Sequence, residues 1–263
     1  LKDFQIATVN YVFKRFTDAE NSCNRFLVAD EVGLGKTLVA RGIIQKFYDY
    51  FKSIDKSELN VIYICSNQSI ASQNIGRLNI EKQKGFAPTQ INRINDLAIT
   101  TINANQNPYL RIIALSPNTS FNISRGGGIV KERAILFHIL CKHFDFSNYK
   151  EKFKKIFRLD VSEANWECWS SRDCFVRKDL REEIVLKFNS AFNSKHPLFK
   201  QLLSSCEERF NNNEQPSYRR LIGGLRKILA SVCVAYLKPD LIIMDEFQRF
   251  KNLINLDEDS DVK

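Results

Sequence analysis

Four short apolar runs alternate with segments of helical periodicity, and this alternation constrains the fold more than any other feature of the sequence. The runs that favour buried strands are Arg25–Ala29, Val61–Cys65, Arg111–Leu115 and Leu241–Met244. Helical spacing of apolar residues follows the first run over 37–47 and the second run over 69–84. Strands that alternate with helices predict an α/β layer structure with a mainly parallel sheet.

A different pattern fills residues 131–238, where strand signals almost disappear and several helical patterns follow one another. The segment Arg125-Gly-Gly-Gly128 precedes it and is interpreted as a flexible break. We therefore predict an α/β lobe formed by 1–125 and 236–263, interrupted by a helical insertion formed by 126–235.

The segment Asp30-Glu-Val-Gly-Leu-Gly-Lys-Thr37 lies between the first apolar run and the helix that follows it, which is where a phosphate-binding loop has to lie. Glycines in the loop let backbone amides approach phosphate oxygens, and the helix offers its own N-terminal amides. Lys36 is expected to reach the β and γ phosphates, and the Thr37 hydroxyl to bind Mg²⁺. The strict pattern G-x-x-x-x-G-K-[ST] has Gly where this chain has Asp30. The residues predicted to bind the nucleotide in this segment are Gly33, Leu34, Gly35, Lys36, Thr37 and Leu38.

The last apolar run leads directly into a pair of acids, Asp245 and Glu246. A nucleotide hydrolase needs one acid at the tip of a strand for the water shell of the metal, and a second carboxylate to orient the attacking water. We assign these catalytic roles to Asp245 and Glu246 in that order, with Lys36, and predict ATP and Mg²⁺ as the bound species. Taken alone, the acid pair could be ordinary surface acids after a strand, and the loop could be an ordinary glycine turn before a helix. The presence of both makes the prediction of a nucleotide site more specific.

The loop at 30–37 together with Asp245-Glu-Phe-Gln-Arg-Phe-Lys-Asn252 resembles the first ATPase lobe of superfamily 2 helicases, specifically the Swi/Snf-like branch. That branch has D-E-x-G-L-G-K-T in the loop, so Asp30 agrees with the family pattern. Its acidic box, D-E-x-H-R-x-K-N, is matched here except at Gln248, where the family usually has His. The resemblance implies a RecA-like, P-loop NTPase lobe in which Gln248 couples the nucleotide site to an opposing lobe.

Three weaker matches extend the resemblance. It implies that Gln5, in the opening segment, contacts the adenine. It also implies nucleic-acid contacts by Ser66 and Gln68, after the second apolar run, and by Ser116 and Thr119, after the third. Small hydroxyl and amide side chains at strand ends suit contacts to phosphates, and they equally suit helix capping, so both interpretations stay open.

The resemblance also implies a longer protein, in which a second lobe supplies an arginine finger and ATP hydrolysis drives movement on double-stranded DNA. We expect this chain alone to bind nucleotide weakly and to hydrolyse it very slowly. One alternative is the lobe of an RNA helicase. The other is a nucleotide-gated scaffold that binds nucleic acid or protein and has no motor activity.

The positive charge of the chain is concentrated in one region. The formal net charge is +9; residues 131–238 contain 21 Lys and Arg against 13 Asp and Glu, and the remaining residues contain 18 against 17. Basic residues there, including Arg219 and Arg220, alternate with aromatic ones, which predicts a helical module that contacts nucleic acid. The alternatives are a docking surface for a partner protein, and solvated helix faces whose aromatic residues form a core.

Two general features exclude other classes. No segment has the roughly 18 consecutive apolar residues of a membrane span, so an integral membrane protein is excluded and no membrane partner is expected. The hydrophobic content of 44% excludes a disordered chain. Seven cysteines, an odd number without a secretory signature, predict reduced thiols in the cytoplasm.

Overall fold

A computed structural model describes residues 1–29, 33–80, 89–91, 93–99, 109–116, 126–171, 174–207 and 215–246. The protein has a mixed α/β fold and divides into two compact units. Among the described residues, the first, which we call the sheet unit, consists of 1–29, 33–80, 89–91, 109–116 and 238–246. The second, which we call the helical unit, consists of 93–99, 126–171, 174–207 and 215–237.

Each unit has its own set of elements. The elements of the sheet unit are α1 (Asp3–Thr17), α2 (Lys36–Ser53), β1 (Leu59–Ile64), α3 (Gln68–Leu78), β2 (Thr89–Gln90), β3 (Leu110–Leu115) and β4 (Leu241–Met244). The elements of the helical unit are η1 (Ile94–Ala98), α5 (Val130–His143), η2 (Ser147–Tyr149), α6 (Lys150–Arg158), α7 (Glu163–Ser170), α8 (Phe175–Lys178), α9 (Glu182–Ala191), α10 (Pro197–Glu207) and α11 (Gln215–Leu237).

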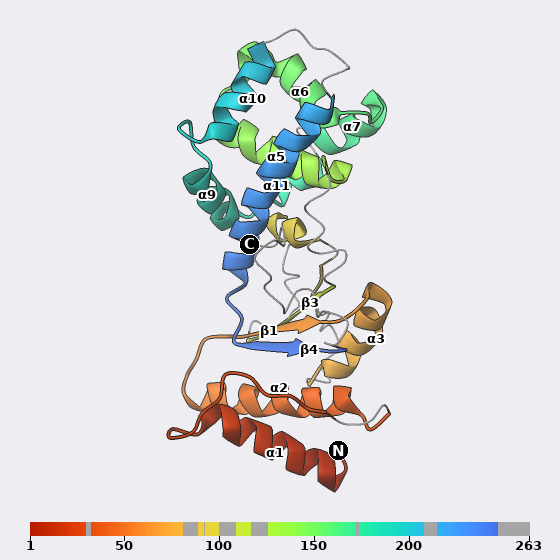
Figure 1. Ribbon diagram of the computed structural model, residues 1–263, viewed down its shortest axis with the longest axis vertical. Coiled ribbons are helices and arrows are strands. Elements are labelled where there is room, and N and C mark those ends of the chain that lie inside the picture. Colours follow the sequence, from red (N-terminus) through yellow and green to blue (C-terminus); the bar gives the residue numbers. More distant parts are fainter. Residues whose placement is uncertain are drawn as a thin grey trace. The chain divides into compact units, whose positions relative to one another are not determined.

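The sheet is parallel throughout, as the sequence predicts. Its strand order is β2-β3-β1-β4, and Val61 of β1 lies opposite both Ile112 of β3 and Leu241 of β4. Alternate side chains of β1, including Leu59, Val61 and Tyr63, enter a core that they share with side chains of α1, α2 and α3. α2 and α3 pack on the sheet and α1 packs on α2 (Figure 1).

α2 begins at the edge of the sheet where the strands end. α2 ends at Ser53 and β1 begins at Leu59, so a short connection reverses the chain, and α2 runs antiparallel to the strand on which it packs (Figure 1). The carboxyl ends of parallel strands share one edge, which is where α/β sheets bind ligands. The first turn of α2 and the residues after β1 and β4 therefore face the same edge.

The first predicted strand, Arg25–Ala29, is wrong, because the segment has no regular secondary structure. Phe26 and Leu27 are exposed, whereas Val28 packs against the core. A strand requires a hydrogen-bonded neighbour, and in the described sheet the outer strands β2 and β4 pair only with β3 and β1. The apolar composition of the segment therefore brings Val28 to the core without forming a strand.

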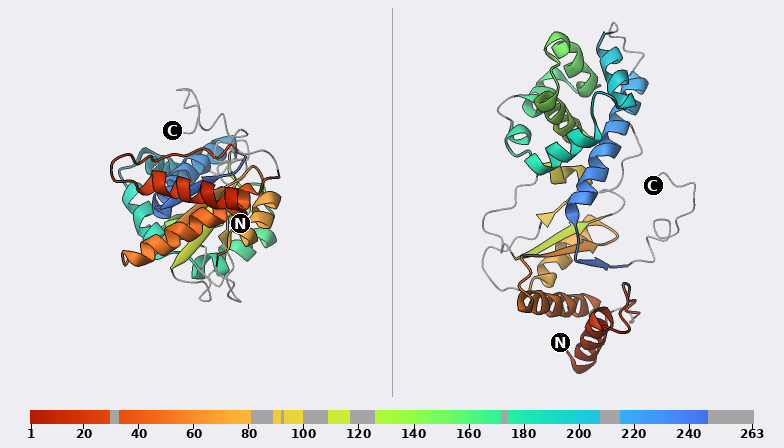
Figure 2. Two further views of the ribbon diagram at one scale, coloured as in Figure 1. Left: turned by 90° about the horizontal axis from the view of Figure 1, so that it is seen from below. Right: turned by 90° about the vertical axis from the view of Figure 1, so that its left-hand side faces the viewer.

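The helical unit is built around α5. Residues Ala134, Ile135 and Ile139 of this helix are completely buried, and α6, α7, α8 and α11 pack around it. Figure 2 (right) shows the long helix α11 running beside the other helices of the unit. The aromatic residues Phe153, which lies among lysines in the sequence, and Trp166 are also buried in this core.

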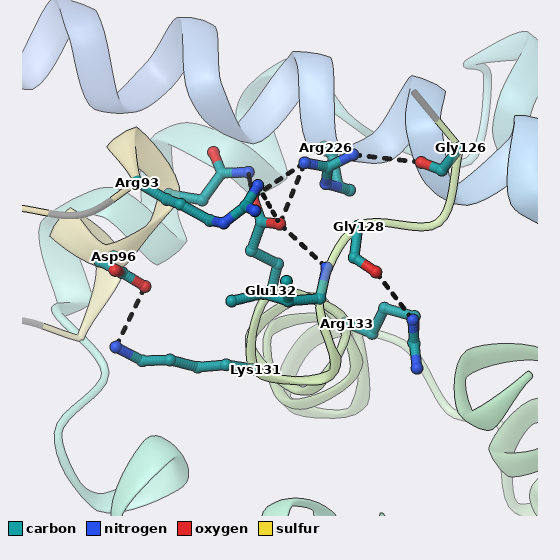
Figure 3. A network of polar contacts seen from close by, with 10 residues as sticks. Arg93, Asp96, Gly126, Gly128, Lys131, Glu132, Arg133 and Arg226 are labelled. Atoms are coloured by element: carbon teal, nitrogen blue, oxygen red, sulfur yellow. Dashed lines mark hydrogen bonds and ion pairs between the residues drawn. The ribbon is translucent and has the colours of Figure 1, made fainter. Parts of the chain in front are cut away.

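A buried carboxylate, that of Glu132 in α5, joins three segments of the helical unit (Figure 3). It lies 3.0 Å from a guanidinium nitrogen of Arg226 in α11, and it accepts a hydrogen bond from Asn95 of η1 at 3.1 Å. Arg93 pairs with the same carboxylate at 3.4 Å. The segment 93–99, which the sequence analysis assigns to the α/β lobe, therefore belongs to the helical unit, because polar contacts far apart in the sequence attach it there.

The glycines before α5 allow close packing rather than flexibility. Gly126 and Gly128 both have φ of +66°, a conformation that residues with a side chain rarely adopt. A Cβ on Gly128 would lie 2.4 Å from Nε of Arg226, so the guanidinium occupies the space that a side chain needs. The carbonyl of Gly126 accepts a hydrogen bond from Arg226 at 3.1 Å. The expectation of a flexible break is therefore wrong for 126–128; Arg125 lies outside the described residues.

None of the helices in the described part of the chain combines the length and apolar character needed to cross a membrane. All seven cysteines are free thiols.

The buried histidine of α5 predicts a pH dependence of the stability of the helical unit. Nε2 of His138 lies 2.9 Å from the carbonyl of Trp169 and 3.1 Å from Sγ of Cys174, and burial lowers its pKa below the ordinary value of 6.5. The unfolded chain therefore takes up a proton more readily than the folded one as the pH falls below about 6.5, so stability is complete above that pH and decreases below it. Thermal unfolding followed by tryptophan fluorescence at a series of pH values measures this.

The substitution His138→Gln is expected to reduce this acid sensitivity, and His143→Gln, at an exposed histidine of the same helix, is the matched control. Equal pH profiles for wild type and His138→Gln would exclude His138 as the responsible group.

Candidate active site

The two acids that follow β4 lie beside the end of β1. The strands pair as far as Ile64 and Met244, and the backbone N–H of Asp245 then donates to the carbonyl of Ile64 at 2.8 Å. Asp245 and Glu246 are both half-buried. Their side chains are thus held next to the residues that follow β1, as the sequence analysis expects for acids at a strand tip.

Asp245 is held by two polar side chains of the sheet unit. The hydroxyl of Tyr63, in β1, donates to Oδ2 of Asp245 at 2.6 Å. Nδ2 of Asn74, in α3, donates to the same oxygen at 3.3 Å and to the Tyr63 hydroxyl at 2.9 Å. These donors converge on one carboxylate oxygen, so the other oxygen remains the better placed to face a metal ion.

Burial keeps the hydroxyl of Tyr63 and the thiol of Cys65 protonated at neutral pH. Burial, followed by the hydrogen bond to Asp245, raises the pKa of Tyr63 well above its ordinary value of 10.0. Burial also raises the pKa of the neighbouring Cys65, with a further contribution from the charges of Asp245 and Glu246. Tyr63 therefore keeps its proton at neutral pH and donates it in the hydrogen bond to Asp245.

Glu246 has a different partner. The hydroxyl of Ser66 donates to Oε2 of Glu246 at 2.5 Å. Glu246 itself has φ of +54°, in the left-handed region that residues with a side chain rarely adopt. Adjacent carboxylates are therefore directed to separate donors, Asp245 to Tyr63 and Asn74, and Glu246 to Ser66.

The glycine-bearing loop leads into α2. Gly35 is the residue before the helix and has φ of +82°, Gly33 has φ of +91°, and no side chain caps this helix start. Gly33, Leu34 and Leu38 are exposed, while Lys36 and Thr37 are half-buried in the first turn. A helix start without a side-chain cap presents backbone N–H groups to an anion.

Gln5 supports this loop from inside the protein. Its side chain is only 4% exposed; Nε2 donates to the carbonyl of Leu34 at 2.9 Å, and Oε1 accepts from the N–H of Lys2 at 2.9 Å. A Cβ on Gly35 would lie 2.6 Å from Nε2 of Gln5, so a side chain at this position would displace the Gln5 amide from the loop. Gln5 thus positions the loop, and its predicted contact with adenine stays a prediction.

The residues at the edge of the sheet where the parallel strands end fit a magnesium nucleotide. The uncapped start of α2 and the Lys36 ammonium are suited to phosphate oxygens. The hydroxyl of Thr37 and the carboxylate of Asp245 are hard oxygen ligands of the type that Mg²⁺ prefers.

The residues predicted to contact nucleic acid lie in different surroundings. Ser66 and Ser116 are buried at the ends of β1 and β3, whereas Arg220 of α11 is exposed and Arg219 pairs with Asp160 at 3.1 Å within the helical unit. Gln68 is the first residue of α3. Thr119 and Gln248, the latter predicted to couple the nucleotide site to an opposing lobe, lie outside the described residues.

Two residues of this site, Tyr63 and Asn74, are absent from the sequence predictions. The available signal was weak: a tyrosine one position before the end of a buried strand, and an asparagine inside a helix that packs on the sheet. Buried polar groups need partners, and here the partner is Asp245, directly after β4 and more than 170 residues later in the chain. Comparisons with protein-family models, curated proteins and solved structures find no match for this chain.

Proposed function

We propose that this chain is the first ATP-binding lobe of a superfamily 2 motor of the Swi/Snf-like type, with the sheet unit as its RecA-like, P-loop NTPase part. The observation that carries the proposal is the organised acid pair: Asp245 and Glu246 follow one strand, and each is hydrogen-bonded by its own donors. The sheet topology supports it by bringing the start of α2 to the same edge. Ordinary surface acids are not held by buried tyrosine, asparagine and serine side chains.

Each residue of this edge has a role in the proposal. Lys36 and the N–H groups at the start of α2 hold the β and γ phosphates, and Thr37 and Asp245 hold the Mg²⁺. When bound, Mg²⁺ supplies neutralisation of charge on the phosphates. Glu246 orients the attacking water and accepts its proton. Tyr63 and Asn74 fix the orientation of the Asp245 carboxylate.

Double-stranded DNA is the partner that we propose for the motor, with contacts from the sheet-unit edge at Ser66 and from basic residues of the helical unit such as Arg220. Phe153 and Trp166 are buried and are not placed to stack on bases, so the contacts that we propose for the helical unit come from basic residues. Comparing the stimulation of ATP hydrolysis by duplex DNA and by single-stranded RNA separates this proposal from an RNA helicase.

Nucleotide binding tests the proposed site directly. We expect a fluorescent ATP analogue to bind the wild-type chain in a saturable, Mg²⁺-dependent manner. The substitution Lys36→Ala should weaken binding between about tenfold and a hundredfold, because it removes a charged contact with phosphate.

The matched control for this experiment is Lys46→Ala, at an exposed lysine further along the same helix, which should leave the affinity unchanged. Absence of binding by the wild type, or equal binding by wild type and Lys36→Ala, would contradict the proposed function.

A further inference from the structure

The turn between β1 and α3 holds Ser66 in a fixed position. The N–H of Cys65 donates to the carbonyl of Leu115 at 3.1 Å, which continues the pairing of β1 with β3 beyond the last strand residue. On the other side, the side chain of Asn67 accepts from the N–H of Ile70 at 2.9 Å and caps α3. Ser66 lies between these anchors and is only 7% exposed. Its hydroxyl therefore has a defined direction.

That hydroxyl is directed at Glu246. The 2.5 Å hydrogen bond occupies Oε2 of the carboxylate to which we assign the orientation of the attacking water. Glu246 also has the left-handed backbone conformation, which is unfavourable for a residue with a side chain and persists only where neighbouring contacts hold it. The hydrogen bond from Ser66 is a contact of this kind, and it keeps the carboxylate turned toward the end of β1.

We propose that Ser66 is a positioning residue that restrains Glu246, and that the restraint is released when a phosphate group of nucleic acid takes the Ser66 hydroxyl. This proposal rests on the function proposed above. A serine hydroxyl has a single proton to donate, so it donates either to Glu246 or to a phosphate oxygen. One hydroxyl then links the nucleotide and the nucleic acid: without nucleic acid it donates to Glu246, and with nucleic acid it donates to a phosphate oxygen instead.

The proposed restraint acts on the carboxylate of Glu246 and not on that of the neighbouring Asp245. Asp245 keeps its donors, Tyr63 and Asn74, in both states, because neither belongs to the turn at 65–67. A ligand at that turn therefore affects Glu246 and leaves Asp245 in place. Binding of the magnesium nucleotide is expected to be insensitive to the state of Ser66, whereas turnover is sensitive to it.

The test is the substitution Ser66→Ala in the two-lobed protein that the proposed function implies, with ATP hydrolysis measured under single-turnover conditions using radiolabelled ATP, with and without duplex DNA. We expect the rate without DNA to rise on the order of tenfold, as loss of a hydrogen bond to a charged group allows, and the stimulation by DNA to shrink correspondingly. The affinity for the fluorescent ATP analogue should stay within a factor of about two of wild type, because Ser66 does not touch the phosphate site.

Three further variants identify the route of the effect. Ser66→Thr keeps the hydroxyl and should behave as wild type, and Ser69→Ala removes an exposed serine from the first turn of α3 and should change nothing. The double variant Ser66→Ala with Glu246→Gln should lose the gain in rate, because the gain passes through Glu246.

Different results would overturn the proposed restraint and the proposed function. A rate in Ser66→Ala that is equal to or below the wild-type rate, or a rise of the same size in Ser69→Ala, would overturn the restraint while leaving nucleotide binding intact. Failure of the wild type to bind the ATP analogue would instead overturn the proposed function, and the restraint with it.

Discussion

Replacing Glu132 by alanine is expected to destabilise the helical unit severely. The Glu132 side chain is 1% exposed, and its carboxylate takes hydrogen bonds or ion pairs from Arg226, Asn95, Arg93 and the N–H of Ile129. Without it, the guanidinium of Arg226, also 1% exposed, stays buried without its counter-charge. Removing one partner of a buried pair costs about 3–5 kcal/mol, a large share of the roughly 5–15 kcal/mol that a domain has in total.

Tryptophan fluorescence isolates this effect, because both tryptophans of the protein, Trp166 and Trp169, lie in α7 of the helical unit. We expect the midpoint of thermal unfolding seen by this probe to fall on the order of 15 °C in Glu132→Ala. The control is Glu182→Ala, which breaks the exposed pair between Lys142 and Glu182 and should cost no more than about 1 kcal/mol. Equal midpoints for the two variants would contradict the structural role of the buried pair.

A double variant distinguishes the buried charge from the loss of packing. Replacing both partners with apolar residues, Glu132→Leu with Arg226→Met, removes the uncompensated guanidinium. It should recover part of the stability lost in Glu132→Ala. Full recovery is not expected, because the side chain of Asn95 and the N–H of Ile129 would still lack their acceptor.

The elements that could be predicted from the sequence are those with a local periodic signal. β1, β3, β4 and the helix that starts at Lys36 each have such a pattern; the strands have nearly the expected bounds, whereas α2 continues to Ser53, beyond the expected end at Phe47. The segment at 25–29 has the same composition as these strands and yet is not one, because strand formation depends on a neighbour that composition does not reveal.

The placement of η1 and the partners of the acids could not be predicted, for a related reason. Asn95 belongs to the helical unit because of a bond to Glu132, and Asp245 meets Tyr63 because β4 pairs with β1. Both contacts join residues far apart in the chain, and neither leaves a periodic trace. The candidate residues Lys36, Asp245 and Glu246 could be named from the sequence because phosphate and metal chemistry restricts residue type at fixed positions in such motifs, and their roles in hydrolysis stay a prediction.

The substitution Glu246→Gln is expected to abolish turnover while leaving nucleotide binding intact. Glutamine has the same shape and retains a carbonyl oxygen that accepts the hydrogen bond from Ser66, so the local structure should persist. It is not able to accept a proton from water, and loss of a general base lowers rates by about 10² to 10⁴. Measuring single-turnover hydrolysis beside the affinity for the fluorescent ATP analogue separates these two properties.

The same variant decides between a motor and a nucleotide-gated scaffold when it is placed in the full-length protein. A motor with Glu246→Gln should hold ATP without turning over and should lose its function, because every mechanical step needs hydrolysis. A scaffold needs only the bound state and should keep its function. The control Glu20→Gln removes the same charge at an exposed position of the sheet unit and should change neither property. Unchanged hydrolysis in Glu246→Gln would remove the acid pair from the mechanism, and with it the restraint exerted by Ser66.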